Sequence, residues 1–264
     1  QAECVVPVHQ LRAGINEIGI IVGDTRKEIM AAVGDGSKFG IKATYIPQDQ
    51  PLGLAHCVLI AHEFLGDDDF VMYLGDNMLE QGLTSFVDDF KNARAAGGPK
   101  APTAQILLCH VENPKQFGVA EVDKDGHVVR LVEKPENPPS DLALVGVYLF
   151  DKTINEAVRS IKPSPRGELE ITDVNNAYLR RGDLRVERFG RGFAWLDTGT
   201  HDSLLEASQY VQTIEHRQGL KVACLEEIAF QQGWICQERL LERAKAFGKT
   251  GYGQYLYSLA GEIA

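Results

Sequence analysis

The sequence predicts an α/β fold, with a Rossmann-like, mixed and mostly parallel sheet, helices on both faces, a small β-hairpin insertion and a C-terminal helical extension. Short β-branched runs alternate with helical patterns through the first half of the chain, as is typical of a sheet sandwiched between helices. Two strand-like runs flank a turn sequence at 123–126, which indicates the hairpin. From residue 225 onward the pattern is helical.

The expected elements follow one another without an internal repeat or a clear linker. We expect strands at 17–22, 42–46, 70–74, 104–110, 119–122, 128–131, 144–150 and 184–189. We expect helices at 25–33, 54–64, 84–96, 153–161, 170–181 and 201–217. The run 70–74 has no polar face and should be covered on both sides. We therefore expect one α/β domain over residues 1–220 and a helical region over 221–264.

The composition is that of a soluble globular protein. The chain has 264 residues, of which 44 % are hydrophobic and 24 % charged, and its formal net charge is −10. An acidic chain is a poor candidate for binding nucleic acid through bulk charge. No apolar run approaches the roughly 20 residues that a membrane span needs. No basic-then-apolar signal segment follows Gln1. We therefore expect a cytoplasmic protein whose partners are neither nucleic acids nor membranes.

The cysteines and histidines do not form a metal-binding pattern. The seven histidines lack the H-x-x-x-H and H-E-x-x-H spacings of metal sites. The cysteines are odd in number, widely spaced and without a C-x-x-C pair; they are Cys4, Cys57, Cys109, Cys224 and Cys236. Buried thiols in a reducing compartment are their expected state.

Two aspartates follow short apolar segments, at positions where ligands bind in an open α/β sheet. Asp76 comes after the expected strand 70–74 and a glycine, and Asp197 precedes the expected helix 201–217. Mg²⁺ takes one or two carboxylates and completes its shell with phosphate and water, so this pair suits a Mg²⁺ site. The alternatives are that Asp76 caps a turn and that Asp197 caps the helix, which is compatible with metal binding.

Three further segments carry groups suited to a phosphate, a sugar or a base. Glu133 and Lys134 precede a proline at a strand end, where the Glu can accept sugar hydroxyl protons and the Lys can neutralise a phosphate. Arg166 lies in a stiff loop before a helix and suits a two-point grip on phosphate. Gln48 and Gly53 lie in a loop that can read a base edge and let backbone approach a flat ring. The ordinary alternatives are a surface ion pair, a solvated arginine and a polar turn.

Taken together, these five segments resemble the sugar-1-phosphate nucleotidylyltransferase family over residues 11–259. Tail segments at 216–222, 226–230, 233–235 and 252–256 resemble the members that transfer a thymidylyl group. The hexapeptide repeats with which many other members end are absent. The resemblance implies the reaction of dTTP with α-D-glucose 1-phosphate to give dTDP-glucose and pyrophosphate, in nucleotide-sugar biosynthesis of the dTDP-rhamnose type. It also implies Mg²⁺ as cofactor, a homotetramer and inhibition by an end product.

The resemblance implies three kinds of site residue. The Mg²⁺ ligands are Asp76 and Asp197, and the catalytic pair that holds the sugar phosphate is Lys134 and Arg166. The substrate-binding positions, which contact the base, the sugar or the phosphates, are Gln48, Gly53, Asp76, Gly118, Glu133 and Gly146. Among them, Gln48 and Gly53 match base-reading positions, and Glu133 matches a ligand of the sugar hydroxyls. Gly118 matches a backbone contact to the sugar, and Gly146 lies by the glucose pocket.

One family signature is absent from the sequence. Family members begin with a strand, a G-G-x-G-T-R-L loop that cradles the triphosphate, and a Lys followed by Pro-Val. The run Val6-Pro7-Val8 matches the end of this signature without restoring the Lys. Since the first strand of such a sheet lies near its middle, its loss should leave a gap flanked by unpaired strand edges. We therefore expect the 264-residue chain by itself to be poorly soluble or inactive.

Three alternatives stay open at this point. A pyrophosphorylase of another nucleotide specificity, such as one using UTP or CTP, is disfavoured by the tail segments. A catalytically impaired fragment or nucleotide-sugar-binding regulatory subunit is favoured by the missing loop and disfavoured by the two acids, Lys134 and Arg166. An NAD-dependent enzyme needs a G-x-G-x-x-G after a strand, and the sequence has none.

Overall fold

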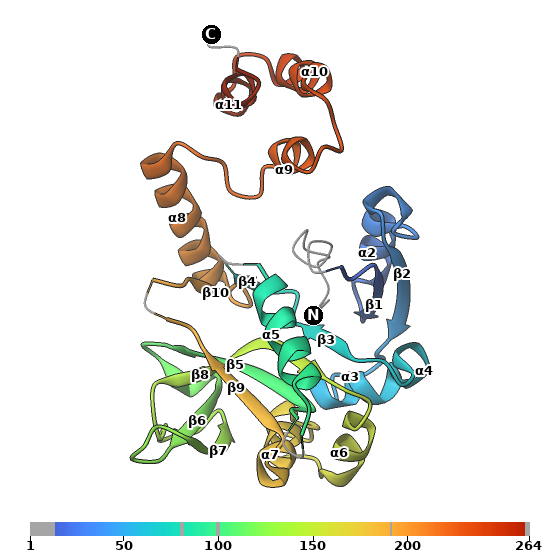
Figure 1. Ribbon diagram of the computed structural model, residues 1–264, viewed down its shortest axis with the longest axis vertical. Coiled ribbons are helices and arrows are strands. Elements are labelled where there is room, and N and C mark those ends of the chain that lie inside the picture. Colours follow the sequence, from blue (N-terminus) through green and yellow to red (C-terminus); the bar gives the residue numbers. More distant parts are fainter. Residues whose placement is uncertain (1–13, 80–81, 99–100, 191, 262–264) are drawn as a thin grey trace. The chain divides into compact units, whose positions relative to one another are not determined.

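The computed structural model describes residues 14–79, 82–98, 101–190 and 192–261, and Figure 1 shows its elements in chain order. The run Val6-Pro7-Val8 and Cys4 lie outside the described residues. The chain forms two compact units, Gln1–Asp197 and Thr198–Ala264. This boundary comes one helix earlier in the chain than the boundary at 220/221 that the sequence suggests, because α8 (His201–Gln218) belongs to the second unit.

The expected strands and helices of the first unit are present, most with ends within two residues of the expected ones. The strands are β1 (Glu17–Val22), β2 (Lys42–Pro47), β3 (Phe70–Tyr73), β4 (Asn77–Leu79), β5 (Ala104–His110), β6 (Gly118–Val122), β7 (Val128–Glu133), β8 (Leu142–Phe150), β9 (Leu184–Arg188) and β10 (Trp195–Asp197). The helices are α2 (Arg26–Val33), α3 (Leu54–Ile60), α4 (His62–Leu65), α5 (Thr84–Ala95), α6 (Ile154–Ser160) and α7 (Ile171–Arg181), with short 3₁₀ turns η1 (Ser37–Phe39) and η2 (Pro114–Gln116). The single helix expected at 54–64 is two helices that meet at Ala61.

The main sheet has six strands in the order β7-β6-β8-β5-β9, with β3 paired to β8. The α/β class and the mixed sheet are confirmed, but the balance of strand directions differs from the expectation. Within the described part of the chain, β1–β2 and β5–β9 are the parallel pairs. The physical reason is β8, which enters the middle of the sheet after the β6–β7 hairpin and runs antiparallel to β3, β5 and β6.

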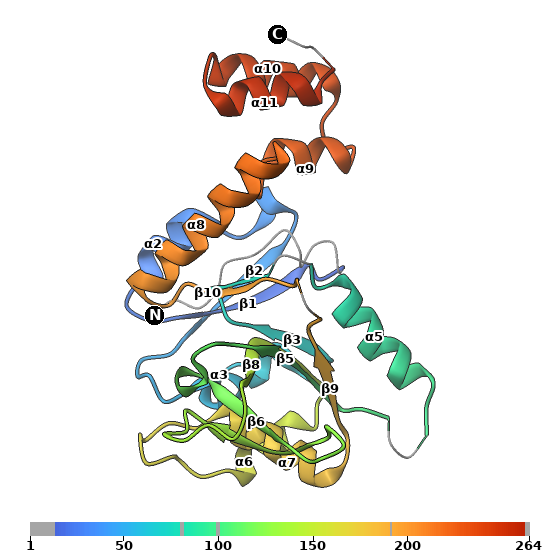
Figure 2. The same cartoon turned by 90° about the vertical axis from the view of Figure 1, so that its left-hand side faces the viewer.

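The side chains of β8 alternate between two hydrophobic cores, as the two-residue period of a strand requires. Leu142, Leu144, Tyr148 and Phe150 join a core with α3, α6 and α7. The alternate residues Val145, Val147 and Leu149 join a core with α5. Helices therefore cover both faces of the sheet, as expected, and Figure 2 shows α5 on one side and α6 and α7 on the other.

The strands β1 and β2 form a separate parallel sheet with α2 packed against it. Among the described residues, β1 pairs only with β2, and β3 pairs only with β8. A cavity of about 510 Å³ lies between β1 and β3, lined on its other sides by residues of α3 and α5. The gap that the sequence suggests beside the first strand stays a prediction, because residues 1–13 lie outside the described part of the chain.

The strands β4 and β10 form a small antiparallel sheet that sequence reasoning did not predict. Each has three residues, which is too short for a periodic pattern. The pairing places Asn77 opposite Asp197 and Leu79 opposite Trp195. It therefore brings together two segments that carry candidate site residues and are far apart in sequence.

The second unit contains four helices among its described residues: α8, α9 (Leu225–Gln231), α10 (Gln237–Phe247) and α11 (Gly251–Leu259). The helix α8 begins with a capping box, in which Thr200 and Ser203 satisfy each other's backbone N–H groups. Helices α10 and α11 pack around a small apolar core that includes Leu240, Ala244 and Leu256. No described helix combines the length and the apolar character that crossing a membrane takes.

Candidate active site

Asp76 lies in the turn between β3 and β4, immediately after the apolar strand that the sequence predicted. Its Oδ1 accepts a hydrogen bond of 2.8 Å from the Asn77 side-chain amide. The hydroxyl of Tyr73 donates to the backbone carbonyl of Asn77 over 2.7 Å, and burial raises the pKa of Tyr73 to about 12. Tyr73 therefore remains a donor at neutral pH and fixes the backbone beside Asp76.

Asn77 connects this turn to two other strands. Its Oδ1 accepts from the backbone N–H of Gly146 over 3.1 Å and from the indole N–H of Trp195 over 2.7 Å. Gly146 belongs to the central strand β8, and Trp195 begins β10. One side chain thus joins the Asp76 turn, the main sheet and the strand that ends in Asp197.

Asp197 is the last residue of β10 and is not the cap of α8. The cap is Thr200, whose side chain accepts from the backbone N–H of Ser203 over 3.1 Å. Asn77 lies opposite Asp197 in the β4–β10 pairing, and Asp76 directly precedes Asn77 in the chain. Two carboxylates on adjoining strand segments are a donor set of the kind that Mg²⁺ uses.

Glu133 ends β7 and is held by Thr172 at the start of α7. The Thr172 hydroxyl donates to Glu133 Oε2 over 2.5 Å. Burial raises the pKa of the Glu133 carboxyl above its ordinary value, and the hydrogen bond from Thr172 opposes that rise. A fixed, partly buried carboxylate is an acceptor suited to sugar hydroxyls.

Arg166 lies in the loop before α7, and acidic side chains surround its guanidinium. Its Nη2 lies 2.9 Å from Oε1 and 3.0 Å from Oε2 of the buried Glu170, and 3.5 Å from an oxygen of both Glu133 and Glu168. The Ser164 hydroxyl donates to the same Glu170 carboxylate over 2.6 Å. These contacts point the guanidinium toward Glu133, so the two predicted site residues are neighbours.

Lys134 has a backbone φ of 40°, in the left-handed region that is unusual for a residue other than glycine. It precedes a proline, and its backbone N–H donates to the carbonyl of Phe117 over 3.0 Å. The Phe117 ring packs on the Trp195 ring with centroids 5.1 Å apart. Contacts therefore run without a break from Asp76 through Asn77, Trp195 and Phe117 to Lys134.

Gln48 follows β2, where its side-chain amide nitrogen lies 3.0 Å from His56 Nδ1 and 3.4 Å from the Gly53 carbonyl. The loop that contains Gly53 is tied to the loop of Arg166 by two backbone bonds. Leu169 donates to Leu52 over 2.8 Å, and Ala55 donates to Leu169 over 3.0 Å. The predicted base-reading loop and the predicted phosphate-holding loop are therefore one connected structure.

Each of the three predicted site glycines leaves room for another residue of the site. A Cβ at Gly53 would lie 2.5 Å from the Leu169 carbonyl oxygen, and Gly53 has a φ of +97°. A Cβ at Gly118 would lie 2.9 Å from the Thr172 hydroxyl, and one at Gly146 would lie 2.7 Å from Asn77 Oδ1. Sequence reasoning expected Gly53 to admit a flat ligand, whereas the structure fills this space with the backbone of Leu169.

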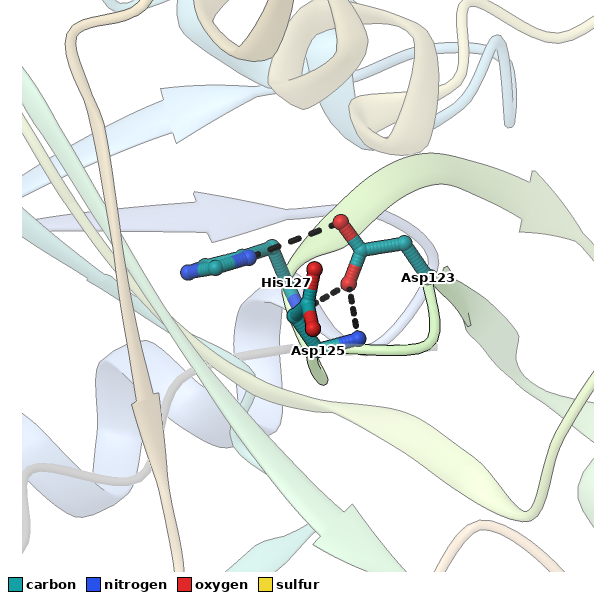
Figure 3. Close-up of side chains that lie close together, drawn as sticks. All are labelled: Asp123, Asp125 and His127. Carbon is teal, nitrogen blue, oxygen red and sulfur yellow. Dashed lines mark hydrogen bonds and ion pairs between the residues drawn. The ribbon is translucent and has the colours of Figure 1, made fainter.

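A cluster of possible metal ligands lies elsewhere, on the turn between β6 and β7. Asp123, Asp125 and His127 come together there on the surface (Figure 3). Asp123 Oδ1 accepts from the backbone N–H groups of Asp125 and His127 over 2.9 Å and 2.8 Å. These bonds explain the cluster as a hydrogen-bonded turn, and the sequence placed its Mg²⁺ ligands at other residues.

The structure brings the predicted residues into two connected groups. One contains Asp76, Gly146 and Asp197, and the other contains Gln48, Gly53, Gly118, Glu133, Lys134 and Arg166. Sequence reasoning missed the residues that hold these groups together, which are Asn77, Phe117, Glu170, Thr172 and Trp195. Their closeness in sequence to the predicted residues is the signal that could have identified them. Asn77, Phe117 and Trp195 each lie within three residues of a predicted site residue. Glu170 and Thr172 follow Arg166 by four and six residues.

Comparison with known proteins identifies the class to which this fold and site belong. A model of the nucleotidyl transferase family matches residues 5–214. The chain is a member of the nucleotidyl transferase family, since the match covers most of its length.

Its curated relatives narrow the class. The chain is 44 % identical over 248 residues to a glucose-1-phosphate thymidylyltransferase of Neisseria meningitidis, covering 94 % of this chain and 84 % of the relative. It is 45 % identical over 251 residues to a glucose-1-phosphate thymidylyltransferase of Mycolicibacterium smegmatis, with coverage of 94 % and 84 %.

Solved structures agree with the fold. A provisionally named glucose-1-phosphate thymidylyltransferase from Bacillus anthracis, in complex with a sucrose, matches with a TM-score of 0.68 at 35 % identity, over 76 % of this chain and 78 % of that one. A UDP-glucose pyrophosphorylase complexed with UDP-glucose matches with a TM-score of 0.65 over 78 % of this chain and 84 % of that one. The latter is 21 % identical and supports the fold alone.

Proposed function

We propose that this protein transfers a thymidylyl group from dTTP to α-D-glucose 1-phosphate and releases pyrophosphate. The named relatives support this choice of substrates, because they are glucose-1-phosphate thymidylyltransferases similar over 94 % of the chain. The observation that supports the proposal is the path of contacts from Asp76 through Asn77, Trp195 and Phe117 to the backbone of Lys134, which connects the segment of a proposed metal ligand to that of a proposed phosphate-holding residue.

The chemistry is an in-line displacement between two anions. A phosphate oxygen of glucose 1-phosphate attacks the α-phosphorus of dTTP, a new P–O bond forms, and the bond to pyrophosphate breaks. The reactants repel each other, so catalysis depends on holding them in line and on neutralising charge. A Mg²⁺ ion bound by Asp76 and Asp197 would supply neutralisation at the nucleotide phosphates.

The chain's own residues have separate roles in this proposal. Lys134 and Arg166 hold the phosphate of the sugar and place its oxygen for attack. Glu133 accepts hydrogen bonds from the sugar hydroxyls, in a position fixed by Thr172. Gln48 offers its amide to the thymine edge, and Gly118 and Gly146 provide the close backbone around the sugar.

A nucleotide panel tests the proposal. The purified protein is incubated with glucose 1-phosphate, Mg²⁺ and one of dTTP, UTP or CTP, and pyrophosphate release is followed with a coupled enzyme. We expect the highest kcat/KM with dTTP. A higher kcat/KM with UTP or CTP would show that the proposed nucleotide is wrong, while the class of reaction would stay the same.

Binding of a nucleotide sugar without turnover is the second candidate, which the sequence left open. Calorimetry with dTDP-glucose, run beside the turnover assay, separates the two. Binding together with turnover supports the enzyme, and binding without turnover supports the second candidate.

We also propose a cytoplasmic homotetramer that serves nucleotide-sugar biosynthesis, with the second unit engaged in assembly and end-product inhibition. The support is the likeness of the tail to the thymidylyl-transferring members. Light scattering of the purified protein measures the assembly, and a dimer or monomer at micromolar concentration would contradict a stable tetramer.

A further inference from the structure

We propose that Asn77 is a positioning residue, which fixes the Asp76 carboxylate for a divalent cation and couples it to Asp197. The proposal rests on the proposed function, in which these two carboxylates are the cation ligands. It goes further by giving a role to Asn77, a residue that the proposed function does not use.

The hydrogen bonds of Asn77 define its orientation. Its Oδ1 accepts from two N–H donors, the Gly146 backbone at 3.1 Å and the Trp195 indole at 2.7 Å. An amide flip would bring the NH₂ group against both donors, so only one orientation satisfies the bonds. In that orientation Nδ2 faces Asp76 Oδ1 at 2.8 Å.

This orientation holds the Asp76 carboxylate before any cation arrives. Fixing a side chain in advance removes an entropy cost that binding would otherwise carry. Residues that hold metal ligands in this way contribute about 10- to 100-fold to metal affinity in characterised sites. The partly buried surroundings of Asn77 strengthen the effect, because water competes less for its hydrogen bonds.

The same amide couples Asp76 to Asp197 through the β4–β10 pairing. Asn77 lies opposite Asp197 in the register, and its bond to Trp195 crosses to the strand that ends in Asp197. The space that Asn77 occupies exists because Gly146 has no side chain, since a Cβ there would lie 2.7 Å from Asn77 Oδ1. Displacing Asn77 should therefore disturb both carboxylates together.

The test measures binding of Mn²⁺ alone, by electron paramagnetic resonance of the free ion, in the full chain without substrate. Asn77→Leu removes the amide, and Gly146→Ala displaces it without altering either carboxylate. Trp195→Phe removes one donor while keeping a ring against Phe117. We expect Mn²⁺ affinity about tenfold lower for Asn77→Leu and Gly146→Ala, a smaller loss for Trp195→Phe, and none for Asn92→Leu, a control on the exposed face of α5.

The indole N–H resonances give a second readout that is independent of turnover. The chain has two tryptophans, and Trp234→Phe assigns their signals. We expect Mg²⁺ to shift the Trp195 signal in the parent protein and to leave it unshifted in Gly146→Ala. An unshifted Trp195 signal in the parent protein would overturn the coupling to Asp197.

Asp76→Asn separates failure of this inference from failure of the proposed function. If Asp76→Asn binds Mn²⁺ like the parent protein, the proposed metal site is wrong. If Asp76→Asn loses Mn²⁺ binding while folded Asn77→Leu keeps it, the positioning role of Asn77 is overturned. Should Asn77→Leu not fold, parent-like affinity in both Gly146→Ala and Trp195→Phe overturns that role equally.

Discussion

Thr172 at the start of α7 donates its hydroxyl proton to Glu133 at the end of β7, with 2.5 Å between the two oxygens. This bond joins a helix and a strand of different parts of the first unit. It stabilises the charged form of a carboxylate whose pKa burial raises. The Thr172 hydroxyl thereby extends to lower pH the range over which Glu133 is ionised.

We expect Thr172→Val to move the pH dependence of dTDP-glucose binding upward. The ionised Glu133 is the form that accepts sugar hydroxyls, so binding falls as the pH drops through its raised pKa. Loss of the Thr172 bond removes a contact that lowers this pKa, and the midpoint therefore rises. Calorimetry between pH 4.5 and 8, a range that begins near the ordinary Glu pKa and extends above it, measures the midpoint. Thr103→Val, which removes a similar bond to Asp183, is the control and should leave the midpoint in place.

We expect Gly53→Ala to destabilise the first unit by about 2–4 kcal/mol. The new Cβ would lie 2.5 Å from the Leu169 carbonyl oxygen at a φ of +97°. Gly167→Ala is a matched control in the neighbouring loop, since its φ is +81° but its Cβ meets nothing within 4 Å. It should cost only about 1 kcal/mol, the strain of the left-handed backbone. Equal losses for the two variants in urea unfolding would contradict the close packing of Gly53 on Leu169.

We expect Arg166→Lys to weaken binding of glucose 1-phosphate about tenfold or more. A lysine keeps the charge but loses the planar fork that Glu170 orients through both of its oxygens. Arg181→Lys, a change in a surface pair with Asp183, should leave the affinity unchanged. Parent-like affinity in Arg166→Lys would remove Arg166 from the phosphate-holding pair.

We expect Thr200→Ala to lower the stability of α8 by about 1 kcal/mol, because Thr200 provides the side-chain cap. Asp197→Asn should affect α8 less, because Asp197 ends β10 and the N-cap residue of α8 is Thr200. Hydrogen exchange of the first-turn amides of α8 distinguishes the two variants. Faster exchange in Asp197→Asn than in Thr200→Ala would contradict this prediction and indicate that Asp197 caps α8.

Strong periodicity explains why most of the fold could be predicted. The strands β1 and β5 have the expected ends, since continuous β-branched or apolar runs mark them. The strands β4 and β10 were missed because three residues carry no period. The antiparallel course of β8 was also missed, because direction depends on tertiary pairing rather than on local pattern.

The charged residues of the candidate site could be predicted from the sequence, but the residues that hold them in place could not. Charged residues at strand ends, such as Asp76 and Glu133, follow from the rule that ligands bind there. Asn77 could not be found in this way, since its partners Gly146 and Trp195 lie 69 and 118 residues away in sequence. The space beside Gly53 could not be predicted either, because only the folded structure shows Leu169 against it.

The rate of pyrophosphate release from dTTP and glucose 1-phosphate, compared between the parent protein and Asp197→Asn, tests the central claim most directly. We predict Mg²⁺-dependent release in the parent protein and loss of most of it in Asp197→Asn, with the circular dichroism spectrum and urea midpoint unchanged. Near-parental turnover by a folded Asp197→Asn protein would contradict the metal site at Asp76 and Asp197 on which the account depends.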